Sequence, residues 1–310
     1  MKQTIKSILH PLISPIHQRL MLNIGYFSPK TLANIQYKRG FKKNINWENP
    51  HNINEKINWL KFNSDTSAWS RLADKYKVRE YICSCGLEDM LVKLYGKWDN
   101  AKDIDWDNLP NEFIMKTNNG SGDVLICRNK AELNTEEATR HFDKMLNNKF
   151  GNFMAEPHYN KIRPCIIAEE LLDNKKQDIT SSSLVDYKIW AFDGKPAYIW
   201  VCYNRTPHSV NVGVYDLDWN FHPEYSISTS HYILSDKKIP KPKSLNRMLQ
   251  AAAIISKGFP ELRVDLYEVD GKPYFGEMTF SSAAGFNDFY TDEFLNILGD
   301  LTHIDGLDRQ

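Results

Sequence analysis

The spacing of apolar residues changes along the chain and predicts helices before strands. From about residue 53 to 96, apolar side chains recur every three or four positions, as in NINEKINWLKFN and DTSAWSRLADKYKVREYICSCG. This period is typical of helices that bury one face. Asp65 is placed as an N-cap, and Gly86 is placed to end the second segment.

Beyond residue 110, apolar and polar residues alternate over short runs separated by glycine turns, which predicts strands. Strands joined by short turns pair as hairpins, so mainly antiparallel sheets are expected. With the helical opening, the pattern predicts the α+β class, with a largely helical N-terminal third. The expected strands lie at 113–116, 123–127 and 164–172 and in hairpins at 186–205 and 263–280, and helices are expected at about 134–148 and 244–257.

The last hairpin, RVDLYEVDGKPYFGEMTF (263–280), carries one carboxylate in each strand, Asp265 and Glu277. A two-residue loop would place them on opposite faces of the sheet, because side chains alternate along a strand. A three-residue loop at 270–272, with its glycine left-handed, would instead set Asp265 opposite Glu277. We expect the second arrangement, with Arg263, Asp265, Glu277 and Thr279 on one face and Val264, Leu266, Gly276, Met278 and Phe280 on the core face.

Two like charges directly opposite each other repel, and a cation between them removes the repulsion. Magnesium suits carboxylate oxygens and binds through one or two of them together with the phosphates of a nucleotide. Asp265 and Glu277 are therefore candidate magnesium ligands. The alternative is a structural hairpin whose acids face water or pair with Arg263.

Phosphates could be bound by KTNNGSGD, a glycine-rich loop between two predicted strands. Gly120 and Gly122 allow the backbone to approach a ligand closely, and backbone amides can then point at phosphate oxygens. Lys116 ends the preceding strand and would add a positive charge. The spacing is not that of a P-loop, and the alternative is a loop that only turns the chain.

Two further predicted strands carry charges among apolar residues. In IIAEELL, Glu169 and Glu170 are adjacent, so one of them points inward or lies at a sheet edge. Such a carboxylate can accept hydrogen bonds from a ribose hydroxyl or lie beside an adenine amino group, or it is an ordinary residue at a strand end. Lys188 in DYKIW is either a second phosphate-binding lysine or a surface charge.

Charge and composition narrow the class of partner. The 310 residues include 39 Lys and Arg and 39 Asp and Glu, a balance that argues against nucleic acid as the main partner. Residues 1–47 hold eight of the basic residues and no acid, yet prolines and charges interrupt them too often for a transmembrane helix or a signal peptide. We expect a cytoplasmic protein whose basic arm packs on its surface or touches an anionic membrane.

The order of these motifs is informative: a lysine strand, a glycine loop, a glutamate strand, a lysine hairpin and an acidic hairpin that ends E-x-T. This order resembles the ATP-grasp superfamily. FIMKTNNGSG, IIAEELL, DYKIWAFDGKP and RVDLYEVDGKPYFGEMTF are similar to the TupA-like ATP-grasp family of bacterial polysaccharide and teichuronopeptide synthesis, over about residues 50–300. The resemblance implies two α+β subdomains that clasp ATP. The implied organisation is a basic arm at 1–47, a helical region at 48–110 and an ATP-grasp domain at 111–310.

The resemblance also implies roles for individual residues. Asp265, Glu277 and Thr279 would hold magnesium, and Thr279 stands where the superfamily usually has asparagine. Arg205 and Arg263 would be catalytic, stabilising charge on an acyl phosphate or on the oxyanion formed after it. The implied ATP-binding residues are Lys116, Asn118, Asn119, Gly120, Ser121, Gly122, Glu169, Glu170 and Lys188.

The implied activity is that of an ADP-forming ligase that joins a carboxylate to an amine. The γ-phosphoryl group of ATP would pass to the carboxylate, and the amine would displace phosphate from the acyl phosphate. The resemblance points to a uronic acid or related carboxylate and an amino acid or other amine, in capsule or cell-wall synthesis. A sugar or polysaccharide kinase is one alternative. A glycosyltransferase is another, because YDLDWN offers a weak metal motif in Asp216-x-Asp218.

Overall fold

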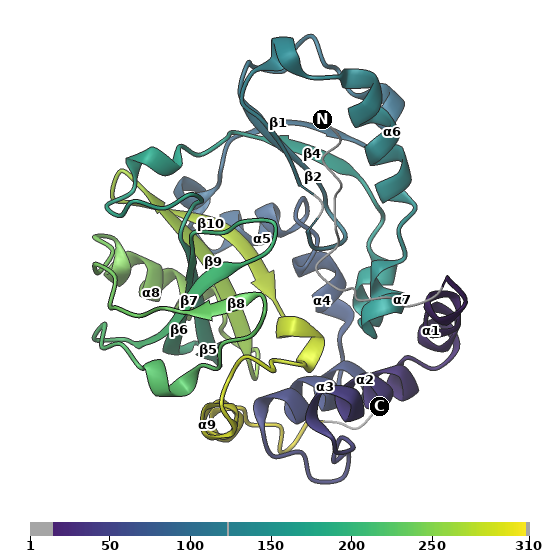
Figure 1. Cartoon of the computed structure of the whole chain (residues 1–310), viewed down its shortest axis with the longest axis vertical. Helices are drawn as coiled ribbons and strands as arrows, with labels where there is room; N and C mark the ends of the chain where they lie inside the picture. The colour runs from purple at the N-terminus through teal and green to yellow at the C-terminus, as the bar shows by residue number, and fades with distance from the viewer. Residues whose placement is uncertain (1–14, 123, 308–310) are drawn as a thin grey trace.

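Two mainly antiparallel sheets form the frame of the protein (Figure 1). The structure is a computed structural model that describes residues 15–122 and 124–307. The small sheet has the order β1-β4-β2-β3 and the large sheet the order β10-β9-β5-β6-β7-β8. The strands are β1 (Leu94–Trp98), β2 (Phe113–Thr117), β3 (Val124–Cys127), β4 (Ile166–Glu169), β5 (Asp186–Phe192), β6 (Lys195–Tyr203), β7 (Val210–Asp216), β8 (Tyr232–Leu234), β9 (Leu262–Val269) and β10 (Lys272–Thr279).

Helices pack against both sheets, which confirms the predicted α+β class (Figure 1). Phe142 of α6 joins the core of the small sheet, and Met248 of α8 joins the core on one face of the large sheet. The other face packs against α3 and α9 through Ile57 and Phe294, beside Trp190. The helices are α1 (Pro15–Phe27), α2 (Pro29–Phe41), α3 (Ile53–Asn63), α4 (Ser67–Leu72), α5 (Val78–Ser84), α6 (Thr135–Leu146), α7 (Phe150–Met154), α8 (Leu245–Ile255) and α9 (Asp292–Leu301).

The β9–β10 hairpin reaches the expected pairing by a different route. Its loop has two residues, Asp270 and Gly271, with φ values of 53° and 70°, so the predicted three-residue loop is wrong. A β-bulge at Gly276 supplies the extra residue, and Glu277 therefore lies opposite Asp265, as predicted. The bulge requires glycine, because a Cβ there would lie 2.9 Å from the carbonyl oxygen of Asp265.

The second helix expected from the apolar pattern is broken in two at Asp74. The carboxylate of Asp74 accepts hydrogen bonds from the backbone N–H groups of Tyr76 (2.9 Å) and Lys77 (3.1 Å). These bonds compete with the helical pattern, so α4 ends and α5 begins after the turn. The helical prediction is also wrong at its end, since residues 94–98 form β1 and pair with β4.

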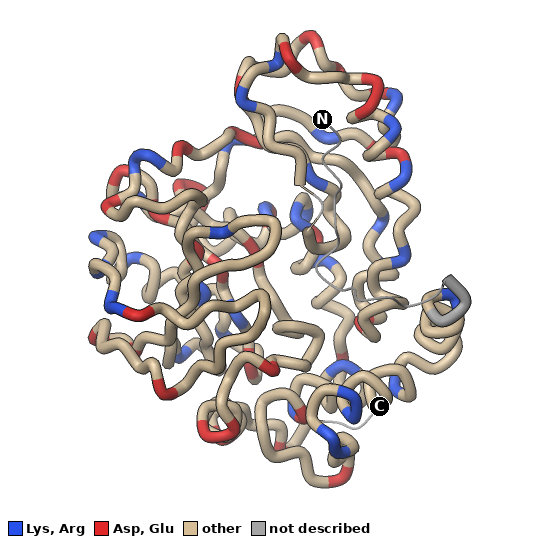
Figure 2. The backbone as a smooth tube through the Cα atoms, viewed as in Figure 1, with Lys and Arg blue, Asp and Glu red and all other residues tan. Residues whose placement is uncertain are grey.

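The N-terminal segment expected as a basic arm contains the helical hairpin α1–α2. Leu32 and Tyr37 of α2 are buried with Ala155, so the hairpin has its own small core. Figure 2 shows Lys and Arg but no Asp or Glu along both helices. Residues 1–14 of the arm lie outside the described residues, and within the described ranges no helix is long and apolar enough to cross a membrane. The division of the chain at 47 and 110 stays a prediction.

We expect the buried side chain of His158 to make folding sensitive to acid. The ring is 2% exposed, and its Nε2 has no hydrogen-bond partner among the described residues. Burial, with the nearby charges of Lys61 and Lys161, lowers the pKa of His158 from 6.5 to about 3. The unfolded chain therefore binds more protons than the folded protein between these values, and stability is lost as the pH falls through this window.

We expect His158→Phe, which keeps a ring beside Trp69, to lose this part of the pH dependence. Urea unfolding at pH 7 and pH 4.5 should show the native protein losing roughly 2 kcal/mol more than the variant. An equal loss in both proteins would show that His158 is not the acid-sensitive group.

Candidate active site

A row of alternating charges crosses one face of the large sheet. Lys188 on β5 pairs with Asp265 on β9, and Asp265 pairs with Glu277 on β10, so these side chains share that face. Nitrogen–oxygen distances between successive members run from 2.5 to 3.9 Å. Each charged side chain therefore lies next to one of opposite charge. The members, which we call the charge row, are in order Arg205, Asp186, Lys188, Asp265, Arg263, Glu277 and Lys75.

Asp265 lies in the middle of the charge row and is 1% exposed. Arg263 donates to it twice, from Nε to Oδ1 at 2.7 Å and from Nη2 to Oδ2 at 2.8 Å, and Lys188 also donates to Oδ2. Burial raises the pKa of the Asp265 carboxyl, but the charges of Arg263 and Lys188 outweigh it and hold that pKa below its ordinary value. Both oxygens thus already have cationic partners, as in the alternative reading of the hairpin.

Glu277 is more open to a ligand than Asp265. Its side chain is 38% exposed and lies 3.8 Å from Nη2 of Arg263. The hydroxyl of Thr279 donates to Oε1 at 3.4 Å. Among the described residues no three His, Cys, Asp or Glu side chains form a ready metal site. Glu277 and Thr279 could hold a magnesium ion together with phosphate oxygens, and Asp265 could join them only by giving up contacts with Arg263 or Lys188.

Lys75, to which the sequence assigned no role, ends the charge row. Its Nζ donates to the carbonyl oxygen of Gly120 and lies 3.9 Å from Oε2 of Glu277. Its backbone N–H donates to the carbonyl oxygen of Asn118 at 3.2 Å. Burial lowers the pKa of Lys75, and the charge of Glu277 opposes that shift. Lys75 thus joins the glycine loop to the large sheet. In the sequence, the one indication of a turn at this point was Asp74, a typical N-cap residue that stands inside a helical pattern.

The glycine loop is fixed at its base and exposed at its tip. Asn118 is 1% exposed, and its amide accepts from the N–H of Cys165 at 2.7 Å and donates to the carbonyl oxygen of Arg163 at 3.1 Å. The side chain of Asn118 therefore holds the base of the loop in place. At the tip, Ser121 is exposed and Gly122 has a φ of 83°, a conformation that favours glycine.

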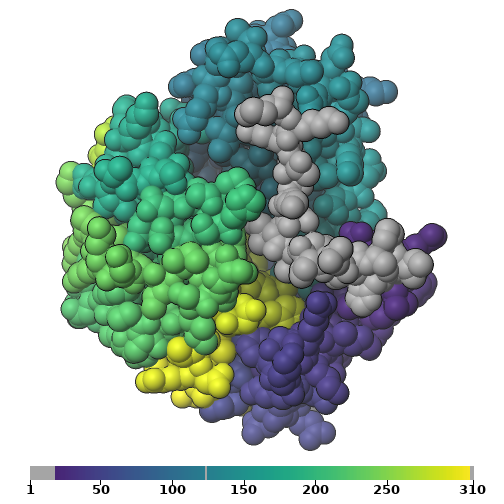
Figure 3. Space-filling view, viewed as in Figure 1, coloured from purple at the N-terminus to yellow at the C-terminus, as the bar shows by residue number. Residues whose placement is uncertain are grey.

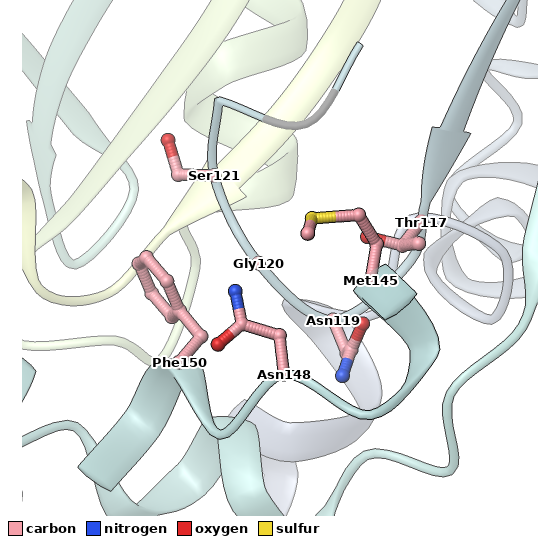
Figure 4. A pocket seen from close by; sticks show the side chains of 7 residues that line it. All are labelled: Thr117, Asn119, Gly120, Ser121, Met145, Asn148 and Phe150. Atoms are coloured by element: carbon pink, nitrogen blue, oxygen red, sulfur yellow. The ribbon is translucent and has the colours of Figure 1, made fainter. Parts of the chain in front are cut away.

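A cavity of about 20 Å³ lies between the glycine loop and residues 145–150 (Figure 4). It has room for roughly one water molecule and not for a nucleotide. Figure 3 shows a wider hollow in the surface, between the teal residues around the small sheet and the green residues of the large sheet. The lining residues of the small cavity are Thr117, Asn119, Gly120, Ser121, Met145, Asn148 and Phe150.

On the small sheet, one of the two adjacent glutamates points inward, as predicted. Glu169 is 6% exposed and accepts from Nζ of Lys116 at 2.7 Å and from Nη1 of Arg79 at 3.1 Å. Glu170 is exposed. Glu169 therefore binds two cations of the protein itself, and Arg79, which the sequence reading did not assign, completes this group.

Comparison with protein families identifies the fold on which these groups of residues lie. A family model described as TupA-like ATP-grasp matches residues 55–303. The chain belongs to the TupA-like ATP-grasp family. Membership confirms the predicted family, the predicted fold and the expectation of an ATP-grasp ligase. Enzymes of the ATP-grasp family use ATP.

Solved structures similar to this TupA-like ATP-grasp chain are distant. D-alanine–D-alanine ligase from Bacillus anthracis is 16% identical with a TM-score of 0.43, and the match covers 78% of this chain and 73% of that one. The same enzyme from Helicobacter pylori is 13% identical with a TM-score of 0.43, covering 81% and 66%. The ATP-grasp ligase PsnB, complexed with a precursor variant, Mg and ADP, is 13% identical with a TM-score of 0.39, covering 80% and 65%.

At these identities and scores, the similarities do not bear on function. The chain spans about two thirds of the length of the Helicobacter pylori enzyme and of PsnB. None of the curated proteins compared with the chain matches it.

The structure brings the predicted site residues of this TupA-like ATP-grasp chain together in two groups. Lys116, Glu169 and the loop 118–122 belong to the small sheet. Asp265, Glu277 and Lys188 belong to the charge row of the large sheet, and Thr279 lies beside it, with its hydroxyl bonded to Arg263 and Glu277. The two predicted catalytic arginines are not neighbours, since Arg205 bonds Asp186 at 3.1 Å at the far end of the row and is 41% exposed. The roles of all these residues stay predictions.

The D-x-D motif forms a turn in the TupA-like ATP-grasp fold. Asp216 accepts hydrogen bonds from the backbone N–H and the side-chain amide of Asn220, at 2.7 and 2.8 Å. Such bonds are typical of an aspartate that stabilises a turn. The motif therefore has a structural explanation that involves no nucleotide sugar.

Lys75→Met should weaken ATP binding by about tenfold or more, because it removes a charge-assisted contact in a partly buried site. The matched control is Lys77→Met, two residues along and exposed, which should leave binding unchanged. Isothermal calorimetry with ATP measures both. Equal affinities in the two variants would remove Lys75 from the site.

Proposed function

We propose that this protein is an ATP-dependent ligase that joins a carboxylate to an amine through an acyl phosphate. The observation that carries the proposal is the contact of the charge row with the glycine loop through Lys75. The charge row has four cations and three anions, and the small-sheet group adds Lys116 and Arg79 against Glu169. Six cations face four anions, an excess of two positive charges that suits a polyphosphate.

The charge row and the small-sheet group would have different roles in the reaction. Lys75 and Lys116 would bind the phosphates from the side of the glycine loop, whose backbone amides cover them. Arg263 is buried and held by Asp265, so its guanidinium is oriented before substrate arrives and stabilises charge on the reacting carboxyl group. Glu277 and Thr279 would hold magnesium, with Asp265 as a further candidate. Bound there, the ion would neutralise charge on the phosphates.

The reaction has two steps with balanced groups. A carboxylate oxygen of the substrate attacks the γ-phosphorus of ATP, the bond to the β-phosphate oxygen breaks, and ADP leaves. The nitrogen of the amine then attacks the acyl carbon, phosphate leaves with the bonding electrons, and the amine loses a proton. The products are an amide, ADP and phosphate. No nucleophilic side chain takes part.

Family resemblance supports a more specific substrate class. The similarity of four motifs to TupA-like proteins favours a uronic acid or related carboxylate and an amino acid or other amine. The product would belong to a capsular or cell-wall polysaccharide. A sugar kinase is the alternative, and the two are distinguished by whether ADP release depends on the amine.

Glu277→Gln should remove the magnesium dependence of ATP binding, because it replaces the exposed carboxylate that the ion would use. Calorimetry with and without magnesium, on the native protein and this variant, makes the test. Asp265→Asn is less suitable, because it would leave Arg263 and Lys188 buried without a counter-charge and destabilise the fold by about 3 kcal/mol. The control is Glu48→Gln, at an exposed acid before α3.

The outcomes of this experiment are separable. Magnesium-dependent binding that only Glu277→Gln abolishes supports the metal site, and screening for amine-dependent ADP release follows. Amine-independent ADP release with a sugar would favour the kinase. A native protein that binds no ATP would refute both.

We also propose that the α1–α2 hairpin touches an anionic membrane near the polymer machinery. Tyr26 and Phe27, at the C-terminal end of α1, are 68% and 81% exposed. Exposed aromatic residues beside basic ones favour the interface of an anionic bilayer. The exposed basic residues in the described part of this segment are Arg19, Lys30, Lys38, Arg39, Lys42 and Lys43.

Sedimentation with phosphatidylcholine vesicles, with and without phosphatidylglycerol, tests this contact. The native protein should bind only the anionic vesicles, and Lys38→Glu with Arg39→Glu should lose most of that binding. Lys175→Glu with Lys176→Glu reverses two exposed charges elsewhere and should retain it. No binding by the native protein, or equal loss in both double variants, would refute the membrane contact.

A further inference from the structure

The turn at 281–287, directly after β10, has a conformation that its own sequence does not favour. Ala283 and Ala284 have φ values of 47° and 56°, in the left-handed region, and Gly285 follows at 81°. Left-handed backbone is unfavourable for alanine and persists only where the surroundings impose it. Two such alanines in succession indicate that other parts of the protein hold the turn in place.

One face of α3 supplies those contacts. Nζ of Lys61 donates to the carbonyl oxygen of Ala284 at 2.7 Å, and Nδ2 of Asn58 donates to that of Gly285 at 3.0 Å. Oδ1 of Asn54 accepts from the backbone N–H and the side-chain amide of Asn287, at 2.9 and 2.7 Å. The three α3 residues are spaced four and three apart, so they lie along one side of the helix.

These three residues, Asn54, Asn58 and Lys61, form what we call the α3 stripe. Their exposed fractions are 0%, 0% and 4%, although α3 belongs to the N-terminal part of the chain. Burying two amides and an amine is unfavourable unless their hydrogen bonds are made, and the bonds to the turn make them only in part, since Nδ2 of Asn54 and Oδ1 of Asn58 have no partner among the described residues. A stripe that only covered the core would more readily be apolar, so its polar groups point to a task at the turn.

The turn at 281–287 also contacts the charge row. Nη1 of Arg263 donates to Oγ of Ser282 at 2.7 Å, and that hydroxyl donates to Oδ1 of Asn287 at 2.8 Å. Asn287 is bonded to Asn54. Arg263 is therefore held on one side by Asp265 and on the other, through Ser282, by the α3 stripe.

A buried acid stabilises the same turn from the other side. The hydroxyl of Ser281 donates to Oε1 of Glu156, a residue that is 4% exposed. Burial raises the pKa of the Glu156 carboxyl and lowers the pKa of the Lys61 amine, and the charge of each group moderates the shift of the other. Lys61 keeps N–H donors for Ala284 in either protonation state. The contact with the turn therefore does not depend on the charge.

We propose that Asn54, Asn58 and Lys61 are positioning residues of the ligase reaction, which keep Ser282 against Arg263 by holding the left-handed turn. This proposal rests on the proposed function, in which Arg263 stabilises charge on the reacting carboxyl group. The N-terminal helical region then belongs to the catalytic machinery. A change on α3 acts on Arg263 without contacting any ligand.

Nuclear magnetic resonance of the full-length protein labelled with ¹⁵N-arginine tests the proposal directly. Arg263 signals are assigned by their loss in Arg263→Lys. Asn54→Ala and Lys61→Met should abolish the slowly exchanging Nη1 proton signal, which reports the bond to Ser282. The Nε signal, which reports the bond to Asp265, should persist in both variants. Loss of one signal with retention of the other is not expected from general destabilisation.

Two further variants separate positioning from stability. Asn52→Ala removes the N-cap of the same helix, where the side chain accepts from the N–H of Glu55, and should retain both signals. Ala284→Gly, added to Lys61→Met, should restore the Nη1 signal, because glycine adopts the left-handed conformation without strain. In the ATP-dependent reaction, Lys61→Met should lower kcat about tenfold or more with KM for ATP changed less than about twofold.

The proposal is overturned if the Nη1 signal survives in both α3 variants, or if Asn52→Ala removes it equally. A native protein that binds no ATP would refute the ligase function. The Nη1 result would stand in that case, because it requires no nucleotide, so the two failures are distinguishable.

Discussion

Three buried charges in one sheet determine much of the remaining structure. Asp265, Arg263 and Lys188 are 1%, 7% and 8% exposed. Removing an ion from water costs several kcal/mol unless opposite charges and hydrogen bonds replace its hydration. The pairing of β9 with β5 supplies these partners, because Arg263 and Asp265 lie on one face of β9 and Lys188 lies opposite Asp265 on β5. Sheet topology and the arrangement of the site therefore satisfy the same electrostatic requirement.

The same ion pairs prepare the site for a ligand and also compete with it. Lys188 and Arg263 neutralise Asp265, so in the proposed function both cations would be in place before a phosphate binds, and little reorganisation would be needed. A polyphosphate can take Lys188 from Asp265 by offering it a new anion. In the proposed function, binding at this face would therefore exchange one partner of Lys188 for another rather than fill an empty site.

Local patterns in the sequence predicted those features of the site that depend on residues close together in the chain. The alternation along β9 and β10 gave the polar face, and the adjacency of Glu169 and Glu170 gave one buried acid. Contacts between distant segments left no such pattern. Lys75 meets the carbonyl oxygen of Gly120 across 45 residues, and Asn54 meets Asn287 across 233. On a helix, an asparagine of this kind looks like an exposed residue until its partner is known.

The β9–β10 hairpin depends on two irregularities that compensate each other. Its two-residue turn alone would send Glu277 into the core, and the bulge at Gly276 returns it to the polar face. The length of the turn and the length of the strand are therefore coupled. In the evolution of this hairpin, a residue gained in the turn would have to be matched by the loss of the bulge. The hairpin can thus accept many substitutions, but insertions and deletions only as pairs.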